Sequence, residues 1–172
     1  MPRCLPTVRR AVRQKRQSSN ARQSRPAVRT GPSINDAHEI KYFRRHSADD
    51  PEQETPARTY LSTCDANIRA KFRAALVAVA AAPPQKFAGG GYWEAMHGEM
   101  TGWYEVRCNG RNRSHHRLFC LIDLAAEGAG RPWLVVIAEM SKPFRTALSD
   151  ADDKNIRELG SEYLARNPRS VV

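Results

Sequence analysis

The sequence has no hydrophobic run long enough to cross a lipid bilayer. Its longest purely apolar stretch, Ala74 to Ala82, has nine residues, whereas a transmembrane helix needs about 20. Internal repeats and CxxC motifs are also lacking, and the four cysteines lie far apart, at Cys4, Cys64, Cys108 and Cys120. We therefore expect no membrane association, no metal site and no cofactor, and we expect reduced thiols in the cytoplasm.

Acidic residues are missing from the first 33 residues, which carry nine of the 28 Lys and Arg residues. Residues 34–172 therefore carry 19 basic residues against 18 acidic ones, so most of the formal net charge of +10 belongs to the tail. The tail mixes Arg with Ser, Gln and Pro and has no apolar stripe, which predicts disorder because it cannot bury enough surface. Its composition fits a polyanion-binding arm or a transit peptide, and an upstream start codon is a further alternative.

Residues 34–172 are predicted to form a linker followed by one globular domain. Residues 34–56 are expected to form the linker, which includes a short strand near Glu39 to Arg44 and an acidic stretch from Ser47 to Pro56. The domain is assigned to residues 57–172. Its first clear element is an amphipathic helix over Cys64 to Ala82, because four apolar residues recur at helical spacing and Asp65 suits the N-cap. Those residues are Ile68, Phe72, Leu76 and Val79.

The stretch Trp103 to Ile122 predicts a β-hairpin with a definite register. Alternation places Tyr104, Val106 and Cys108 on one face of the first strand, and Leu118, Cys120 and Ile122 form the matching apolar set on the second. Both sets can face one core only if even positions pair with even positions, since a one-residue slip turns a whole set outward. The odd positions then share the other face. This face would hold Trp103, Glu105, Arg107, His115, Arg117 and Phe119.

A buried strand and a closing helix complete the expected domain. Trp133 to Ala138 is a continuous apolar run typical of a central strand, with Lys142 and Arg145 just beyond it. Ser149 opens a helix that runs to Leu164, and acidic residues in its first turn suit the helix dipole. The fold class is therefore α+β, with an N-terminal helix or helical hairpin packed on a small antiparallel sheet and a C-terminal helix.

Four short motifs, in this order, resemble a known family. They are Trp-Glu-x-Met-x-Gly from Trp93, Gly-Trp-Tyr-Glu-Val-Arg from Gly102, His-Arg-Leu-Phe from His116 and Ser-Lys-Pro-Phe from Ser141. Their order and spacing resemble the RelE/HigB-like toxins of bacterial type II toxin–antitoxin modules, and most closely the phage-derived HigB-like branch of the RelE/ParE superfamily. The resemblance covers roughly residues 57–169 and implies a RelE-like domain.

The resemblance implies a toxin that binds the ribosome and cuts mRNA by attack of a ribose 2′-hydroxyl on the adjacent phosphate. Its partners would be the ribosome, mRNA and a cognate antitoxin, a helix-turn-helix protein similar to HigA. Such cleavage needs proton transfer and positive charge near the phosphate. Alternatives are a ParE-like inhibitor of gyrase, and a non-catalytic remnant that binds RNA or an antitoxin.

Five residues are candidates for the chemistry that the resemblance implies. Arg107 and Arg117 would bind phosphate through their guanidinium groups, which pair bidentately with phosphate oxygens. His115 or His116 could transfer protons, and register favours His115 because it shares the arginine face. Glu105 is a weak base or an ion-pair partner, and Lys142 is a phosphate contact or a base. The structural alternative is that the arginines form ion pairs with Glu105 or Glu94.

Further residues are candidates for RNA contacts without chemistry. These are Arg111 and Arg113 in the hairpin turn, His116, Arg145 and Arg169. Members of the family often end in a catalytic tyrosine or histidine. This chain instead ends in Ala165-Arg-Asn-Pro-Arg-Ser-Val-Val172, so the general acid is not identified. Trp93 and Trp103 could stack on bases, although packing in a core is the commoner use of tryptophan.

Overall fold

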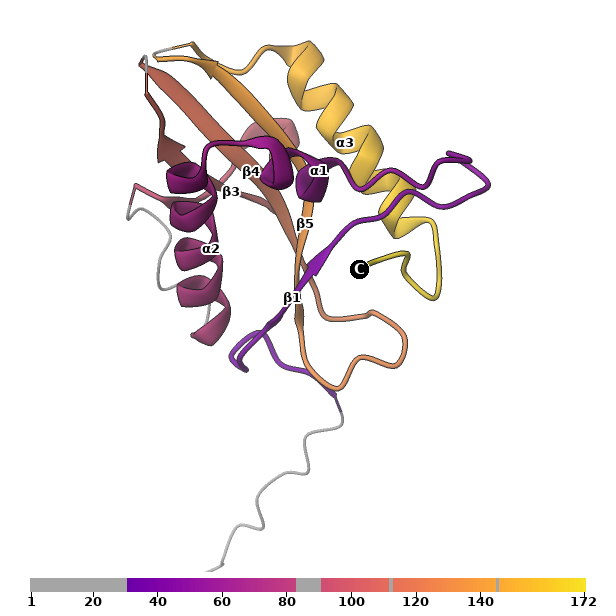
Figure 1. Cartoon of the computed structure of the whole chain (residues 1–172). Helices are drawn as coiled ribbons and strands as arrows, with labels where there is room; N and C mark the ends of the chain where they lie inside the picture. The colour runs from indigo at the N-terminus through magenta and orange to yellow at the C-terminus, as the bar shows by residue number, and fades with distance from the viewer. Residues whose placement is uncertain (1–30, 83–90, 112, 145) are drawn as a thin grey trace, which may run out of the picture.

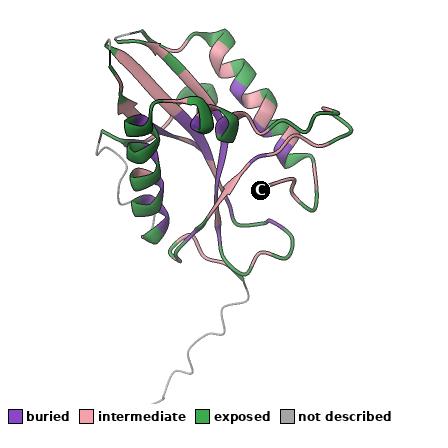
Figure 2. Ribbon diagram, in the orientation of Figure 1, coloured by how far each residue is buried: buried purple, intermediate pink, exposed green. Residues whose placement is uncertain are grey.

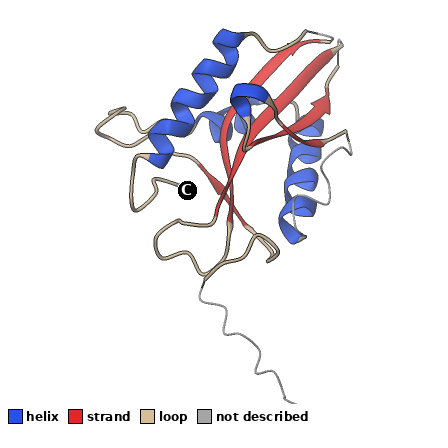
Figure 3. Cartoon of the chain, turned by 180° about the vertical axis from the view of Figure 1, so that it is seen from behind, coloured by secondary structure: helices blue, strands red, loops and turns tan. Residues whose placement is uncertain are grey.

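The computed structural model describes residues 31–82, 91–111, 113–144 and 146–172. A five-stranded sheet forms its middle layer, in the order β1-β5-β4-β3-β2. Helices α1 (Pro56–Thr63) and α2 (Ala66–Ala81) lie on one side and α3 (Asp150–Leu164) on the other, as Figures 1 and 3 show from opposite directions. The predicted α+β class is confirmed. Almost all of the basic tail falls outside the described residues.

The sheet is mixed rather than antiparallel, which corrects the expectation. Strands β2 (Trp93–Ala95), β3 (Trp103–Asn109), β4 (Ser114–Asp123) and β5 (Trp133–Pro143) pair antiparallel in sequence order. Strand β1 (Glu39–Tyr42) instead pairs parallel with β5. A parallel neighbour requires a long crossover connection, so this arrangement depends on contacts distant in sequence. The short strand expected near Glu39 to Arg44 is present as β1, so part of the segment assigned to the linker belongs to the sheet.

The hairpin register agrees with the prediction that even positions of the two strands pair with each other. Tyr104 pairs with Cys120 and Val106 with Leu118, so even positions pair with even positions, and odd positions pair likewise, as Arg107 does with Arg117. The even face packs under α1 and α2, where Val106, Leu118 and Cys120 are fully buried. The odd face packs under α3 and includes Phe119. Burial is concentrated in the middle of the sheet, whereas the strand ends near the hairpin turn are half-exposed (Figure 2).

Helix α2 begins and packs as its sequence predicts. The Asp65 side chain accepts a hydrogen bond from the backbone N–H of Asn67 at 2.8 Å, which satisfies one of the free donors of the first turn. The four periodic apolar residues, Ile68, Phe72, Leu76 and Val79, are all buried in the core shared with the sheet. No helix among the described residues is long and apolar enough to cross a membrane.

Helix α3 carries a capping box and lies very close to the sheet. The Ser149 side chain accepts from the Asp152 backbone N–H, and the Asp152 carboxylate accepts from the Ser149 N–H. Gly160 permits the close approach, because a Cβ there would lie 2.3 Å from the Trp103 ring. Trp103 and Trp93 are both buried, so the core packing alternative is confirmed for the two tryptophans.

The C-terminal residues are fastened to the domain at two points. Val172 exchanges backbone hydrogen bonds with Tyr42 at 2.9 and 3.0 Å and thereby extends the sheet beyond β1. The buried Asp123 carboxylate accepts hydrogen bonds from Tyr163 Oη at 2.7 Å and Arg169 Nε at 2.9 Å. We call this arrangement of Asp123, Tyr163 and Arg169 the C-terminal lock.

Candidate functional site

One end of the odd sheet face carries most of the predicted catalytic residues. Glu105 and Arg107 lie on β3, His115 and Arg117 on β4, and Lys142 on β5. Register pairs Arg107 with Arg117, and His115 with Lys142. Directly paired residues on one face have Cβ atoms roughly 5 Å apart, so the five side chains share a small area. We call these five residues the charged face.

Every cation of the charged face has a carboxylate partner. Arg107 forms ion pairs with Glu94 and, through Nε at 3.3 Å, with Glu105. Arg117 reaches the other Glu105 oxygen through Nη1, also at 3.3 Å. Glu94 pairs with Glu105 in the sheet, which places both acids on the arginine side. The structural alternative raised for the two arginines is therefore realised.

Lys142 connects the charged face to α3. Its Nζ bonds to the Asp152 carboxylate, the same group that closes the capping box. The hydrogen bond from Lys142, followed by those from Ser149, lowers the pKa of Asp152 to about 2. Asp152 is therefore ionised near neutral pH, and Lys142 stands beside a permanent negative charge.

Within the charged face, Glu105 is an acid whose surroundings favour proton uptake. Burial raises its pKa above the ordinary value, although Arg117 and Arg107 oppose this effect. Its side chain is only 10% exposed, less than that of Arg107 at 29%. A carboxylate with a raised pKa is a better proton acceptor than an ordinary one. Glu105 can therefore orient both arginines and can also take up a proton.

His115 belongs to the same face and lies against an aromatic ring. Its imidazole stacks on Phe144, with ring centroids 4.3 Å apart and planes 20° from parallel. Its Nδ1 is buried and has no hydrogen-bond partner among the described residues. The register places His115 beside Lys142 on the charged face. The stacking on Phe144 orients its ring there.

His116 lies on the opposite face from His115, and its contact with RNA stays a prediction. Tyr60 of α1 bonds to Nδ1, and Ser114 Oγ lies 3.0 Å from Nε2. Ser114 donates to the Arg111 carbonyl at 2.8 Å, so the consistent tautomer has Nε2–H donating to Ser114 and Nδ1 accepting from Tyr60. Burial lowers the pKa of His116. Gly110 makes room for this chain of bonds, since a Cβ there would meet Nε2 at 2.2 Å.

The remaining predicted RNA contacts divide into two groups. Arg111 and Arg113 are exposed at the hairpin turn, where they are accessible to a polyanion. Arg169 is held by Asp123 and also donates to the carbonyls of Leu164 and Arg166 at 2.7 and 2.6 Å. This bonding gives Arg169 a structural role, and its contact with RNA stays a prediction. Arg145 lies outside the described residues.

Two residues that matter at the site were not identified from sequence. Asp152 neutralises Lys142, and Tyr60 fixes His116. The only local signal was the spacing of Ser149 and Asp152, which fits a capping box. Among the described residues, no group of three or more His, Cys, Asp or Glu side chains could hold a metal ion.

Comparison with known proteins gives no relative. No protein-family model, no curated protein and no solved structure matches the chain. The functional interpretation therefore depends on the sequence motifs and on the geometry of the charged face.

Proposed function

We propose that the protein is a toxin-like endoribonuclease that cuts mRNA on the ribosome and that a cognate antitoxin neutralises. The observation that carries the proposal is the pairing of Arg107 with Arg117 next to the pair of His115 and Lys142. Three adjacent strands thus place two guanidinium groups, an amine and an imidazole on one face, and we propose that the scissile phosphate binds there. The motif order Trp-Glu, Glu-Val-Arg, His-Arg-Leu-Phe and Ser-Lys-Pro-Phe supports the same family of functions.

The reaction would transfer a proton at each end of a phosphate displacement. The ribose 2′-oxygen attacks phosphorus and gives its proton to Glu105 or His115, and the bond to the 5′-oxygen breaks. The products are a 2′,3′-cyclic phosphate and a 5′-hydroxyl, which needs a proton from a general acid. Arg107 and Arg117 stabilise the charge that develops on the phosphate oxygens. Lys142 contributes positive charge at the edge of the site.

RNA binding must compete with the existing ion pairs. The side chains of Arg107 and Glu94 are 29% and 34% exposed, and ion pairs of such exposure contribute only about 0–1 kcal/mol. A phosphate can therefore replace Glu94 at low cost. Arg117 is only 12% exposed and stays beside Glu105, so it acts from a fixed position. This division predicts that Arg107 exchanges partners while Arg117 does not.

A second candidate function is a binding module without catalysis. The charged face itself favours it, because Glu94, Glu105 and Asp152 balance Arg107, Arg117 and Lys142. A face with no excess positive charge attracts RNA only weakly at a distance. In this case the exposed turn arginines would make the main RNA contacts, and no strand scission would accompany binding.

Overproduction in bacteria separates the two candidates. Wild-type protein should stop incorporation of labelled methionine within minutes and shorten the mRNAs detected on northern blots. The Arg107→Ala/Arg117→Ala double variant should lose both effects. Arg131→Ala/Lys154→Ala is a matched control, because it removes two exposed cations that belong neither to the charged face nor to another candidate site. Arrested growth with intact mRNAs would refute the cleavage proposal.

A further inference from the structure

An open groove of about 930 Å³ lies between α1, α2 and β1. It belongs to the even side of the sheet, because Ile40 and Tyr42 pack against the core that α1 and α2 cover. The charged face lies on the odd side. A ligand in the groove would therefore not touch the residues of the proposed cleavage site.

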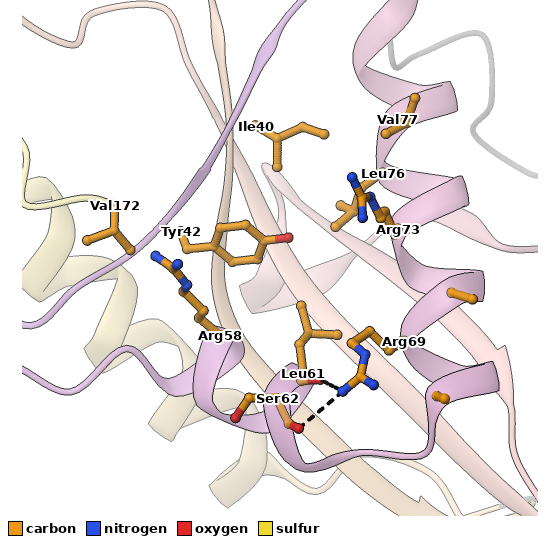
Figure 4. A pocket seen from close by; sticks show the side chains of 12 residues that line it. Ile40, Tyr42, Arg58, Leu61, Ser62, Arg69, Arg73, Leu76, Val77 and Val172 are labelled. Carbon is orange, nitrogen blue, oxygen red and sulfur yellow. Dashed lines mark hydrogen bonds between the residues drawn. The ribbon is translucent and has the colours of Figure 1, made fainter.

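The floor of the groove is apolar. Ile40 and Tyr42 come from β1, Leu61 from α1, and Leu76 and Val77 from α2 (Figure 4). The Val77 side chain is 53% exposed, which makes it one of the large apolar residues most open to solvent among the described residues. Apolar side chains gathered in a hollow mark a binding surface more often than scattered ones do.

The rim of the groove is cationic. Arg58 on α1 and Arg69 and Arg73 on α2 line it, and none of the described residues that line it is Asp or Glu. Arg69 donates to the carbonyls of Leu61 and Ser62, each at 3.1 Å, and is thereby oriented. Arg58 and Arg73 have no hydrogen bond or ion pair to any residue that the structure describes. Their guanidinium groups are therefore available to an anionic partner.

The positive charge of Arg58 and Arg73 acts on Tyr42 in the floor of the groove. Burial raises the pKa of Tyr42, with a smaller contribution from Cys120, and Arg58 and Arg73 both act to lower it. Figure 4 shows the Tyr42 ring between the two arginines. Positive charge thus lies on both sides of an apolar centre. An apolar centre with a polar, Arg-rich rim is the anatomy of a protein interface.

The geometry favours a helix over an extended strand. The backbone of Tyr42 is already paired with Val172 and the Arg44 N–H with Ser170, so this part of the β1 edge cannot accept an added strand. The groove runs along α2, where Arg69, Arg73 and Val77 follow one another at intervals of one turn and span roughly 12 Å. A helix of two to three turns fits this length and contacts a groove through side chains alone.

We propose that this groove binds an amphipathic helix of a partner protein, whose apolar side chains contact Ile40, Tyr42 and Val77 and whose acidic side chains contact Arg58 and Arg73. The apolar stripe would recur at intervals of three and four residues, with Asp or Glu on both flanks. This inference stands independently of RNA cleavage, because it uses a different side of the sheet.

Selection of peptides tests the proposal without knowledge of the natural partner. A displayed library of 16-residue helix-forming peptides would be selected on the full-length protein. Enriched peptides should share the apolar spacing and carry acidic flanks. Arg58→Glu/Arg73→Glu should weaken their binding at least tenfold, and so should Val77→Asp. The control Arg131→Glu/Lys154→Glu makes the same charge change at exposed sites outside the groove.

The outcomes separate this proposal from the proposed function. Circular dichroism would first establish that each variant is folded. Acidic amphipathic peptides that depend on the groove support the proposal even if no RNA is cut. Selection of basic or non-helical peptides would overturn it, and so would peptides that bind the groove variants as well as wild type. A library that yields no groove-dependent binder would also overturn it.

Discussion

The C-terminal lock predicts a large loss of stability when Asp123 loses its charge. The Asp123 side chain is 4% exposed and that of Arg169 is 12% exposed. Asp123→Asn keeps the size of the side chain but leaves the Arg169 guanidinium without its counter-charge. Removing one partner of a buried ion pair typically costs about 3–5 kcal/mol. Arg169 retains two carbonyl acceptors, so we expect the lower end, about 3 kcal/mol.

Two further variants divide this loss between the contacts. Tyr163→Phe removes one hydrogen bond to Asp123 and should cost about 1 kcal/mol. Arg169→Gln combined with Asp123→Asn should cost less than the sum of the single changes, because the two residues interact directly. For a chain of this size, about 3 kcal/mol corresponds to a fall in Tm of roughly 6–12 °C.

Urea unfolding at pH 7, followed by far-UV circular dichroism, measures these differences. If Asp123→Asn lowered the unfolding free energy by less than about 0.5 kcal/mol, the C-terminal lock would not stabilise the fold, because ordinary surface substitutions cause changes of that size. Acid provides a second check. Burial alone would raise the pKa of Asp123, but hydrogen bonds from Arg169 and Tyr163 lower it overall. The stabilisation is therefore complete above the unfolded pKa of about 3.9 and is lost as pH falls through the lower folded value.

Three other predictions concern packing, competition and pH. Gly160→Ala should lower unfolding free energy by about 1–3 kcal/mol, because the new Cβ would overlap the Trp103 ring; an unchanged melting temperature would contradict this contact. Glu94→Gln should tighten binding of a short RNA to Arg107 about two- to fivefold at low salt, and fluorescence anisotropy that shows no change would mean that Arg107 does not exchange partners. Burial lowers the pKa of His116, so stability should fall as pH drops from 7 towards 5, and His116→Asn should flatten this slope in urea titrations; an equally steep slope would exclude His116 as its source.

Regular local patterns were sufficient to predict much of the fold. The spacing of Ile68, Phe72, Leu76 and Val79 identified α2, and alternation along β3 and β4 gave their register. Both signals arise because a core accepts apolar side chains from only one face of an element. The parallel pairing of β1 with β5 was not predicted. Parallel pairing depends on contacts far apart in sequence, and four residues of β1 carry no local sign of it.

The charged face was predictable only in part. The alternation of side chains along the two strands is sufficient to place Arg107, Arg117 and His115 on one face. The carboxylate that neutralises Lys142 comes from another element, and the sequence gives no direct sign of which strand α3 covers. The structural role of Arg169 was missed for the same reason, because its buried acid partner, Asp123, lies 46 residues away in the sequence. The partners in an ion pair depend on the tertiary structure. The face to which a strand residue points depends only on its position in the local sequence.

Primer extension on an mRNA under translation in vitro tests the central claim most directly. Purified wild-type protein should produce cuts in register with codons, and only when ribosomes are present. Arg107→Ala/Arg117→Ala should abolish these cuts, and the matched Arg131→Ala/Lys154→Ala variant should retain them. An intact message with folded wild-type protein, or equal cutting by the Arg107/Arg117 variant, would contradict the assignment of the charged face as a ribonuclease site.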